Sequence, residues 1–142
     1  MNMPFLAGRP RHVPGIHNSV LAPCPGRPNC VCSDAANPEN SISPLILNTP
    51  GDKAWMAIRE AVLRLPRTRI VSESDVYLHV ECRSALLGFV DDLELHLREQ
   101  NNLIAVRSAS RRGYRDFGVN RKRVEQLRAV LTAQGVTKSG TG

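Results

Sequence analysis

Residues 76–106, VYLHVECRSALLGFVDDLELHLREQNNLIAV, decide the fold class. Apolar and polar residues alternate in 76–83 and again in 93–98, which is typical of strands with one face on a core and the other in water. The polar run 100–102 and the apolar residues after it predict a hairpin. Together with a short strand over 69–74, these patterns predict a mostly antiparallel sheet of about four strands.

A helix is predicted on each side of this sheet. In residues 52–65 the apolar side chains recur at spacings of three, four and three, namely Trp55, Ile58, Val62 and Leu65. Asp52 is the expected N-cap, and Pro66 marks the end of this helix. The C-terminal helix has Asn120 as its expected N-cap and Gly135 as the residue that ends it. The predicted fold is therefore α+β.

The N-terminal third of the chain is rich in proline. Most of the ten prolines lie in the first 50 residues, which excludes a long helix or a central strand there. We expect this proline-rich stretch to be an extended arm. The expected organisation is a flexible arm over residues 1–20, a single α+β domain over 21–134 and a disordered tail over 135–142.

The composition is that of one globular domain. The chain has 142 residues, of which 42% are hydrophobic and 23% charged, and this excludes a disordered or fibrous protein. No stretch approaches the roughly 20 apolar residues that a transmembrane helix needs. The N-terminus lacks the apolar run of a secretory signal, so a cytoplasmic location is the default expectation. Aromatic residues make up only 4%, which leaves few rings for stacking on nucleic-acid bases.

Positive charge is concentrated in residues 107–123, RSASRRGYRDFGVNRKR. This segment holds seven basic residues and one acid, so its net charge of +6 equals that of the whole chain. The basic residues 121–123 fall in the first turn of the predicted C-terminal helix, where the helix dipole disfavours cations. A bound anion, or carboxylates from elsewhere in the fold, would supply the missing negative charge.

We therefore expect a module that binds a small anion, a phosphate or a carboxylate; the sequence indicates no particular cofactor. The candidate ligand-binding residues are Arg107, Ser108, Ser110, Arg111, Asp116, Asn120, Arg121 and Arg123. The arginines would clamp the anion through bidentate contacts, and the serines and the asparagine would orient it.

Two pairs of titratable residues lie on the predicted strands. Asp91 and Asp92 point to opposite faces of a strand, and the role of internal partner for an arginine is favoured for them over that of metal ligand or general base. His79 and His96 alternate onto the polar side of their strands, and we expect both at the surface.

Three of the four cysteines fall within nine residues, and their spacing leaves several interpretations open. Cys24 and Cys30 could form a disulfide in an exported protein, or complete a metal site with His12 and His17. Either could instead be a nucleophilic thiol if cations lower its pKa. Cys82, on the apolar side of its strand, is expected in the core.

Three other functions compete with anion binding. The same pocket could be enzymatic, with Cys24 or Cys30 as nucleophile and Asp92 or Asp116 as base. The arginines and acids could instead form a purely structural network in a protein-interaction domain. The basic balance also allows nucleic-acid binding, which ranks last because the cluster is compact and carries no nucleic-acid motif.

Three motifs, in this order, resemble the uncharacterised family named domain of unknown function 1499. They are LAPCPGRPNCV at 21–31, FVDD at 89–92, and a third over 107–123 with RSASR, Gly113, Asp116, Gly118 and NRKR, and the resemblance covers roughly residues 20–133. It implies a compact single domain, often exported or membrane-associated in relatives, and it implies no activity. The motif positions add Cys24, Asn29, Cys30 and Asp92 to the candidate site.

Overall fold

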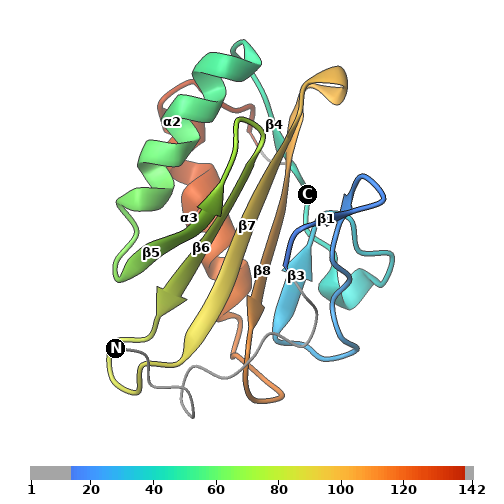
Figure 1. The fold of residues 1–142 in the computed structure, drawn as a ribbon, viewed down its shortest axis with the longest axis vertical. Helices are drawn as coiled ribbons and strands as arrows, with labels where there is room; N and C mark the ends of the chain where they lie inside the picture. The colour runs from blue at the N-terminus through green and yellow to red at the C-terminus, as the bar shows by residue number, and fades with distance from the viewer. Residues whose placement is uncertain (1–13, 140–142) are drawn as a thin grey trace.

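The computed structural model describes residues 14–139 and has two layers, a sheet and a pair of helices. Both helices, α2 (Gly51–Leu63) and α3 (Val119–Ala133), lie on the same face of the sheet (Figure 1). The other face is turned toward the viewer in that figure. The α+β prediction is confirmed, and the first helix lies within two residues of its expected bounds at each end.

The sheet has six strands, not the expected four. They are β3 (Cys30–Cys32), β4 (Leu45–Ile46), β5 (Thr68–Glu73), β6 (Tyr77–Arg83), β7 (Val90–Arg98) and β8 (Leu103–Ser110). The pairings between these strands are antiparallel, in the order β3-β8-β7-β6-β5, and β4 also pairs with β8. The two unpredicted strands, β3 and β4, come from the proline-rich arm and lie at the β8 edge, where prolines nearby are tolerated. Strands of two or three residues are too short to show a period in the sequence.

Turn residues connect these strands as the sequence indicates. The predicted hairpin joins β7 to β8 through the 3-10 helix η2 (Glu99–Asn101), and Asn102 closes it in the left-handed conformation (φ 55°). A smaller hairpin, β1 (Ile16–His17) and β2 (Val20–Leu21), precedes the sheet. A second 3-10 helix, η1 (Pro38–Asn40), follows β3.

Both predicted N-caps are wrong. The N-cap position of α2 is Pro50 and carries no side-chain cap, so Asp52 lies inside the first turn, where its charge still suits the helix dipole. The N-cap of α3 is Gly118 in the left-handed region (φ 79°), and Asn120 is buried one position into the helix. Asp116 takes over the capping role. Gly135 (φ 76°) follows the end of α3, as predicted.

The main core fills the space between the sheet and the two helices. Its fully buried side chains come from both layers: Ile58, Val62, Leu78, Val80, Leu93, Leu95, Ile104, Val106, Val124, Leu127 and Leu131. Burying each one stabilises the fold by roughly 1.5–3 kcal/mol before conformational entropy is counted. This core holds the apolar sides of β6, β7 and β8 against the helices and fixes which side chains point the other way.

The chain after α3 folds back onto the sheet edge. Val136 and Thr137 are buried, and Thr137 forms a β-bridge with Leu47. These residues belong to the stretch expected as a tail. Among residues 14–139, no helix is long and apolar enough to cross a bilayer.

Candidate functional site

The face of the sheet turned away from the helices carries a layer of charged and polar side chains. We call it the polar face, and its members are Arg69, Tyr77, His79, Glu81, Asp92, Glu94, Arg107 and Arg111. They share this face because side chains alternate along each strand. Arg69 is exposed and Tyr77 and Arg111 are partly buried, whereas the other five are buried. Glu94 has no exposed surface and Arg107 has 3%. Charges buried to this extent need partners.

Glu94 lies at the centre of one part of the polar face. Its Oε1 accepts hydrogen bonds from the Tyr77 hydroxyl (2.6 Å) and from the backbone N–H of Gly15 (2.8 Å). Its Oε2 accepts from Nη1 of Arg107 (3.2 Å), and Nη2 of Arg107 donates to the carbonyl of Pro23 (3.1 Å). Burial and the neighbouring Glu94 raise the pKa of Tyr77 well above its usual value, so its hydroxyl remains a donor.

Asp92 and Arg111 form the other part. Nε and Nη2 of Arg111 donate to the two carboxylate oxygens of Asp92 (2.8 and 2.7 Å), and Nη2 also reaches Glu81 (2.7 Å). His79 Nε2 lies 2.7 Å from the same carboxylate. Burial acts to raise the pKa of Asp92, but the hydrogen bonds from Arg111 and His79 outweigh it and lower that pKa below its usual value.

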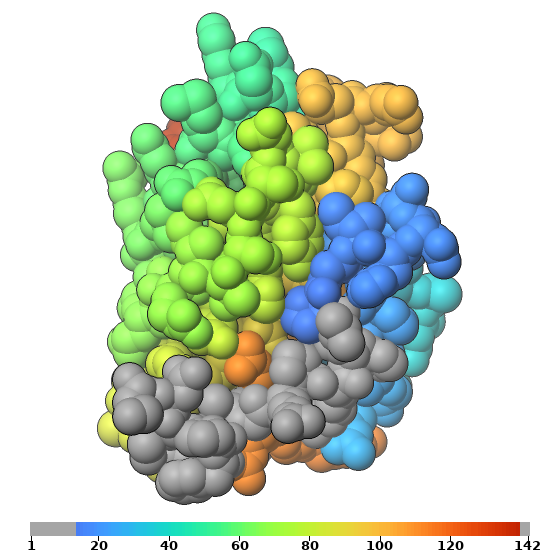
Figure 2. Space-filling view, in the orientation of Figure 1, coloured from blue at the N-terminus to red at the C-terminus, as the bar shows by residue number. Residues whose placement is uncertain are grey.

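The expectation that His79 lies at the surface is wrong, since it is 6% exposed. Alternation correctly placed it away from the core, but that face is covered, not wet. Figure 2 shows the first described residues lying over the β8 side of this face, in agreement with the contacts of Gly15 and Pro23. His96, on the same side of β7, is partly buried.

A second polar cluster lies on the opposite side of the sheet, between β8 and the start of α3. We call it the helix-side cluster, and its members are Asn29, Asp91, Ser108, Ser110, Asp116, Asn120 and Arg123. Its centre is Asn120, which is fully buried. Asn120 Oδ1 accepts from Ser108 (2.6 Å), and its Nδ2 donates to Ser110 (2.9 Å).

Asp116 and Arg123 close this cluster. Asp116 accepts from the backbone N–H groups of Gly118 (2.9 Å) and Asn120 (3.0 Å), so it supplies the cap that α3 lacks. Arg123 Nη1 donates to Ser108 (3.0 Å), and Nη2 donates to Asp91 (2.8 Å). Burial raises the pKa of Asp91, and Arg123 opposes that rise only in part.

A cleft opens beside this cluster, at the end of the sheet where α3 begins. Its volume is about 580 Å³, and we call it the arginine cleft. Its walls are Arg67, Arg83, Ser84, Phe89, Val90, Asp91, Ser110, Arg112, Gly113, Arg115, Asp116, Phe117, Val119 and Arg123. Four of these residues also line a smaller cavity of about 230 Å³, namely Arg67, Arg83, Val119 and Arg123. The two cavities therefore adjoin.

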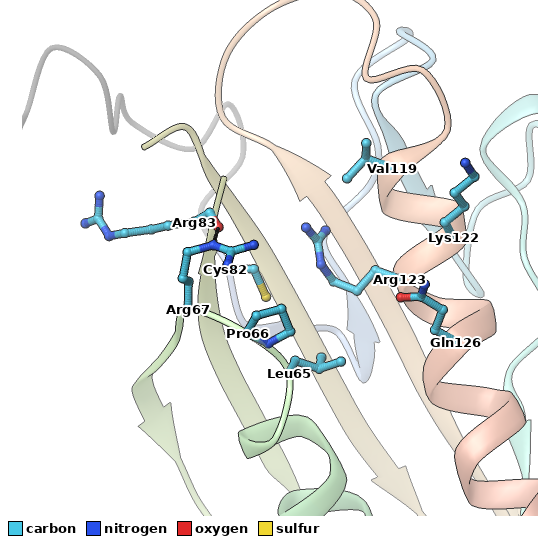
Figure 3. Close-up of a pocket in the computed structure, with 9 residues that line it drawn as sticks. All are labelled: Leu65, Pro66, Arg67, Cys82, Arg83, Val119, Lys122, Arg123 and Gln126. Carbon is cyan, nitrogen blue, oxygen red and sulfur yellow. Dashed lines mark hydrogen bonds between the residues drawn. The ribbon is translucent and has the colours of Figure 1, made fainter. Parts of the chain in front are cut away.

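The arginines of the cleft differ in whether they are neutralised. Arg123 is paired with Asp91, whereas within residues 14–139 no carboxylate pairs with Arg67, Arg112 or Arg115. The guanidinium of Arg115 stacks on the ring of Tyr114 (5.5 Å to its centroid). Figure 3 shows the guanidinium groups of Arg67 and Arg123 reaching toward the same space from opposite walls of the smaller cavity.

Comparison with protein families connects these features. The model of the family described as Protein of unknown function (DUF1499) matches residues 20–131. The chain belongs to this family. The DUF1499 match runs from β2 into α3, so it contains both polar clusters and the cleft. Neither the curated proteins nor the solved structures include a match to the chain.

In this DUF1499 domain the predicted site residues do not form one group. Arg107 and Arg111 lie on the polar face, whereas Ser108, Ser110 and Arg123 lie on the helix side, because β8 alternates between the two. Arg121 lies apart from both clusters and donates to the carbonyls of Glu39 (3.3 Å) and Ser41 (3.0 Å). Among the predicted residues, only Ser110, Asp116 and Arg123 line the arginine cleft.

Sequence reasoning missed the cleft residues Arg67, Arg83 and Phe89. They come from segments far from 107–123, and no local pattern connects Arg67 and Arg83 with it. Phe89 begins the FVDD motif, of which the predicted site includes only Asp92. Arg112 and Arg115 carried a usable signal, because both lie in the basic segment close to Gly113 and Gly118, where the strand has ended. In a loop, side chains no longer alternate between the two faces of the sheet, so they can point toward a ligand.

Of the open interpretations of the cysteines, the structure has the disulfide Cys24–Cys30. It ties the chain before β3 to that strand and leaves neither sulfur free as a nucleophile. The two free cysteines, Cys32 and Cys82, are buried, and burial raises the pKa of each to about 11. Cys82 is in the core, as expected. His12 lies outside the described residues, among which no group of three His, Cys, Asp or Glu is placed to hold a metal ion.

Proposed function

We propose that this domain is a binding module for an organic anion and that the arginine cleft is its binding site. The observation that carries the proposal is the uneven neutralisation of the arginines. Arg67, Arg112 and Arg115 direct positive charge at the cleft without a carboxylate partner among the described residues. Nε of Arg67 donates to the carbonyl of Arg83 (2.9 Å), and its terminal nitrogens, like the guanidinium groups of Arg112 and Arg115, have donors for a phosphate or a carboxylate.

On the polar face, Arg107 and Arg111 are already bonded to carboxylates, although the buried Nε of Arg107 has no hydrogen-bond partner among the described residues. Nη1 of Arg107 is bonded to Glu94 and Nη2 to a backbone carbonyl, and Arg111 is held by two carboxylates. An anion at either residue would have to displace a buried carboxylate and leave it without a counter-ion. We therefore assign Arg107, Arg111, Asp92 and Glu94 to an internal network and the anion site to the cleft.

Arg123 connects the helix-side cluster with the cleft. It lines the cleft while it donates to Asp91 and Ser108, so its position is fixed before any ligand arrives. In the proposal, Arg123 keeps its bond to Asp91 and orders the wall of the cleft. Arg112 and Arg115, which have no carboxylate partner among the described residues, hold the anion.

The test is a thermal-shift and titration series with inorganic phosphate, acetate and small organic phosphates and carboxylates. A ligand at about 100 times its Kd stabilises a domain by roughly 2.7 kcal/mol, which is readily detected. We expect stabilisation by at least one of these anions, and at least a tenfold weaker affinity in the double variant Arg112→Gln/Arg115→Gln.

The matched control is Lys53→Gln/Lys138→Gln, which removes the same charge from exposed positions outside the cleft. It should retain the affinity of the unsubstituted protein to within about twofold. Equal loss in both double variants would show that only the net charge matters, and a lack of stabilisation by every anion would refute the proposal.

A further inference from the structure

The cleft is larger and more apolar than a simple anion requires. A volume of about 580 Å³ lies in the range of pockets that hold whole organic molecules, whereas a phosphate or carboxylate group alone fills a small part of it. Phe89, Val90, Phe117 and Val119 contribute apolar walls next to the arginines. The site therefore combines cationic groups with an apolar surface, and its natural ligand must carry both an anionic group and an apolar part.

The apolar wall is exposed to an unusual degree. The ring of Phe117 is 90% exposed and that of Phe89 is 42% exposed. The loop between β6 and β7, which provides Ser84 and Phe89 to the cleft, also carries Leu86 (94% exposed) and Leu87 (57% exposed). Large apolar side chains gathered at one end of a domain indicate that something apolar covers them.

The backbone at Phe117 supports the same interpretation. Its φ of 55° is in the left-handed region, which a bulky aromatic residue rarely adopts. No core packing compensates for this conformation, because the ring points into solvent at the rim of the cleft. A strained residue that gains nothing within the fold is expected to gain something from a ligand.

We infer that the ligand of the cleft is an anionic amphiphile, a molecule with a carboxylate or phosphate head and an apolar chain. The head lies among the guanidinium groups of Arg67, Arg112 and Arg115, and the chain runs along Phe89 and Phe117. This inference rests on the proposed function, to which it adds the class of ligand. The smaller cavity, with Leu65, Pro66 and Cys82 in its wall, extends the apolar surface beneath the head (Figure 3).

The experiment is a calorimetric titration of the full chain with straight-chain carboxylates from acetate to decanoate, each below its micelle concentration. Each methylene buried against the apolar wall should tighten binding about fourfold, up to the length at which the wall ends. 1-Octanol, which has the chain without the charge, should bind at least tenfold more weakly than octanoate.

Failure of this inference can be distinguished from failure of the proposed function. If acetate and octanoate bind with equal affinity, and Arg112→Gln/Arg115→Gln weakens both, the anion site stands and the amphiphile is wrong. If no carboxylate and no phosphate binds, both are wrong. Sedimentation with phosphatidylcholine vesicles containing phosphatidylglycerol, without binding of free carboxylates, would overturn the inference in favour of a membrane surface.

The variant that isolates the apolar wall is Phe117→Asn. Asparagine tolerates the left-handed conformation, and the ring it removes is exposed, so the fold is retained. We expect this variant to bind acetate as before and to lose most of the gain from acetate to octanoate. Met56→Asn, at a 68% exposed position on α2, is the matched control and should keep that gain. Equal loss in both variants would contradict the assignment of Phe117.

Discussion

Arg111 and Arg112 are neighbours in the chain but belong to two different regions of the molecule. Arg111 donates three hydrogen bonds to Asp92 and Glu81 on the polar face, whereas Arg112 lines the arginine cleft and is exposed. The charge is the same in both, and the difference is whether the fold supplies a counter-charge. A neutralised arginine contributes to folding, and one without a counter-charge is available to a ligand.

The difference has a thermodynamic scale. Removing one partner of a buried ion pair leaves the other charge uncompensated and typically costs about 3–5 kcal/mol. Substituting an exposed side chain without a partner usually changes stability by less than about 0.5 kcal/mol. Variants of the polar face should therefore lose stability, whereas variants of the arginine cleft should lose anion affinity with little change in stability.

The largest effect is expected from Glu94→Gln. The amide keeps the shape of the side chain but leaves the charge of Arg107 buried without its counter-ion, so the free energy of unfolding should fall by roughly 3–5 kcal/mol. Chemical denaturation measures this loss. Glu60→Gln, the same change at an exposed position of α2, should cost less than about 0.5 kcal/mol. A small loss at Glu94 would mean that Arg107 does not depend on it.

The second-largest effect is expected from acid, which should lower the free energy of unfolding by protonating carboxylates of the polar face. The pKa values of Asp92 and Glu81 lie below their ordinary values of 3.8 and 4.5, because hydrogen bonds from arginines outweigh the effect of burial. Their stabilising contribution is complete above those ordinary values and is lost as the pH falls through the lowered values. The free energy of unfolding should therefore decline below about pH 4.5. In Asp92→Asn this decline should be smaller, and an unchanged acid slope would contradict the assignment.

Loss of the disulfide should have an intermediate effect. Cys24 and Cys30 are six positions apart, and closing so short a loop stabilises by roughly 2 kcal/mol in the chain-entropy model. Cys24→Ser/Cys30→Ser should lose about this amount and leave anion affinity in the cleft unchanged, because neither cysteine lines it. Dithiothreitol should lower the stability of the unsubstituted protein equally. Equal stability with and without reductant would show that the bond does not form.

Asp116→Ala should move stability and binding in opposite directions. Loss of the cap of α3 costs about 1 kcal/mol, while removal of a carboxylate from the cleft should tighten anion binding severalfold. Asp116→Asn separates the two effects, because its amide oxygen still accepts a backbone hydrogen bond but carries no charge. It should keep most of the stability and still bind anions more tightly. Weaker binding in both variants would place the anion elsewhere.

The sequence predicted the helices and the long strands well because each has a period. Alternation over residues 76–83 gives the correct two faces of β6, and Cys82 is in the core as expected. The same pattern cannot tell a face in water from a face covered by another segment, so His79 was misplaced. The edge strands β3 and β4 pair with β8 through backbone hydrogen bonds between segments far apart in the sequence. Strands of two or three residues are too short to show an alternation of apolar and polar side chains.

The sequence indicated the residue types of the candidate site, namely arginines beside serines and acids, but not which of them lie together in the fold. The apolar residues that predicted this strand end at Val106, but β8 continues to Ser110. The sequence pattern therefore did not place Arg107 and Ser108 on opposite faces of the sheet. The buried acid Glu94 was not singled out, because one acid in an alternating strand looks like any solvated position. The cleft depends on Arg67 and Phe89, which only the tertiary fold brings near Arg123.

The smallest effect on stability, and the sharpest test of the comparison, is expected from Arg112→Gln. Its side chain has no ion pair among the described residues, so unfolding should change by less than about 0.5 kcal/mol, while the affinity for the anion should fall severalfold. Arg111→Gln, one residue away, removes the arginine bonded to Asp92, while Glu81 keeps its bond to Arg69, and should lower stability by roughly 3 kcal/mol or more. Denaturation and titration of both variants, under one set of conditions, measure the contrast. The same substitution at two adjacent residues changes the same charge, so any difference between the variants comes from where the fold places each side chain. If the two variants were alike in both stability and affinity, the separation of an internal network from a ligand site would be wrong.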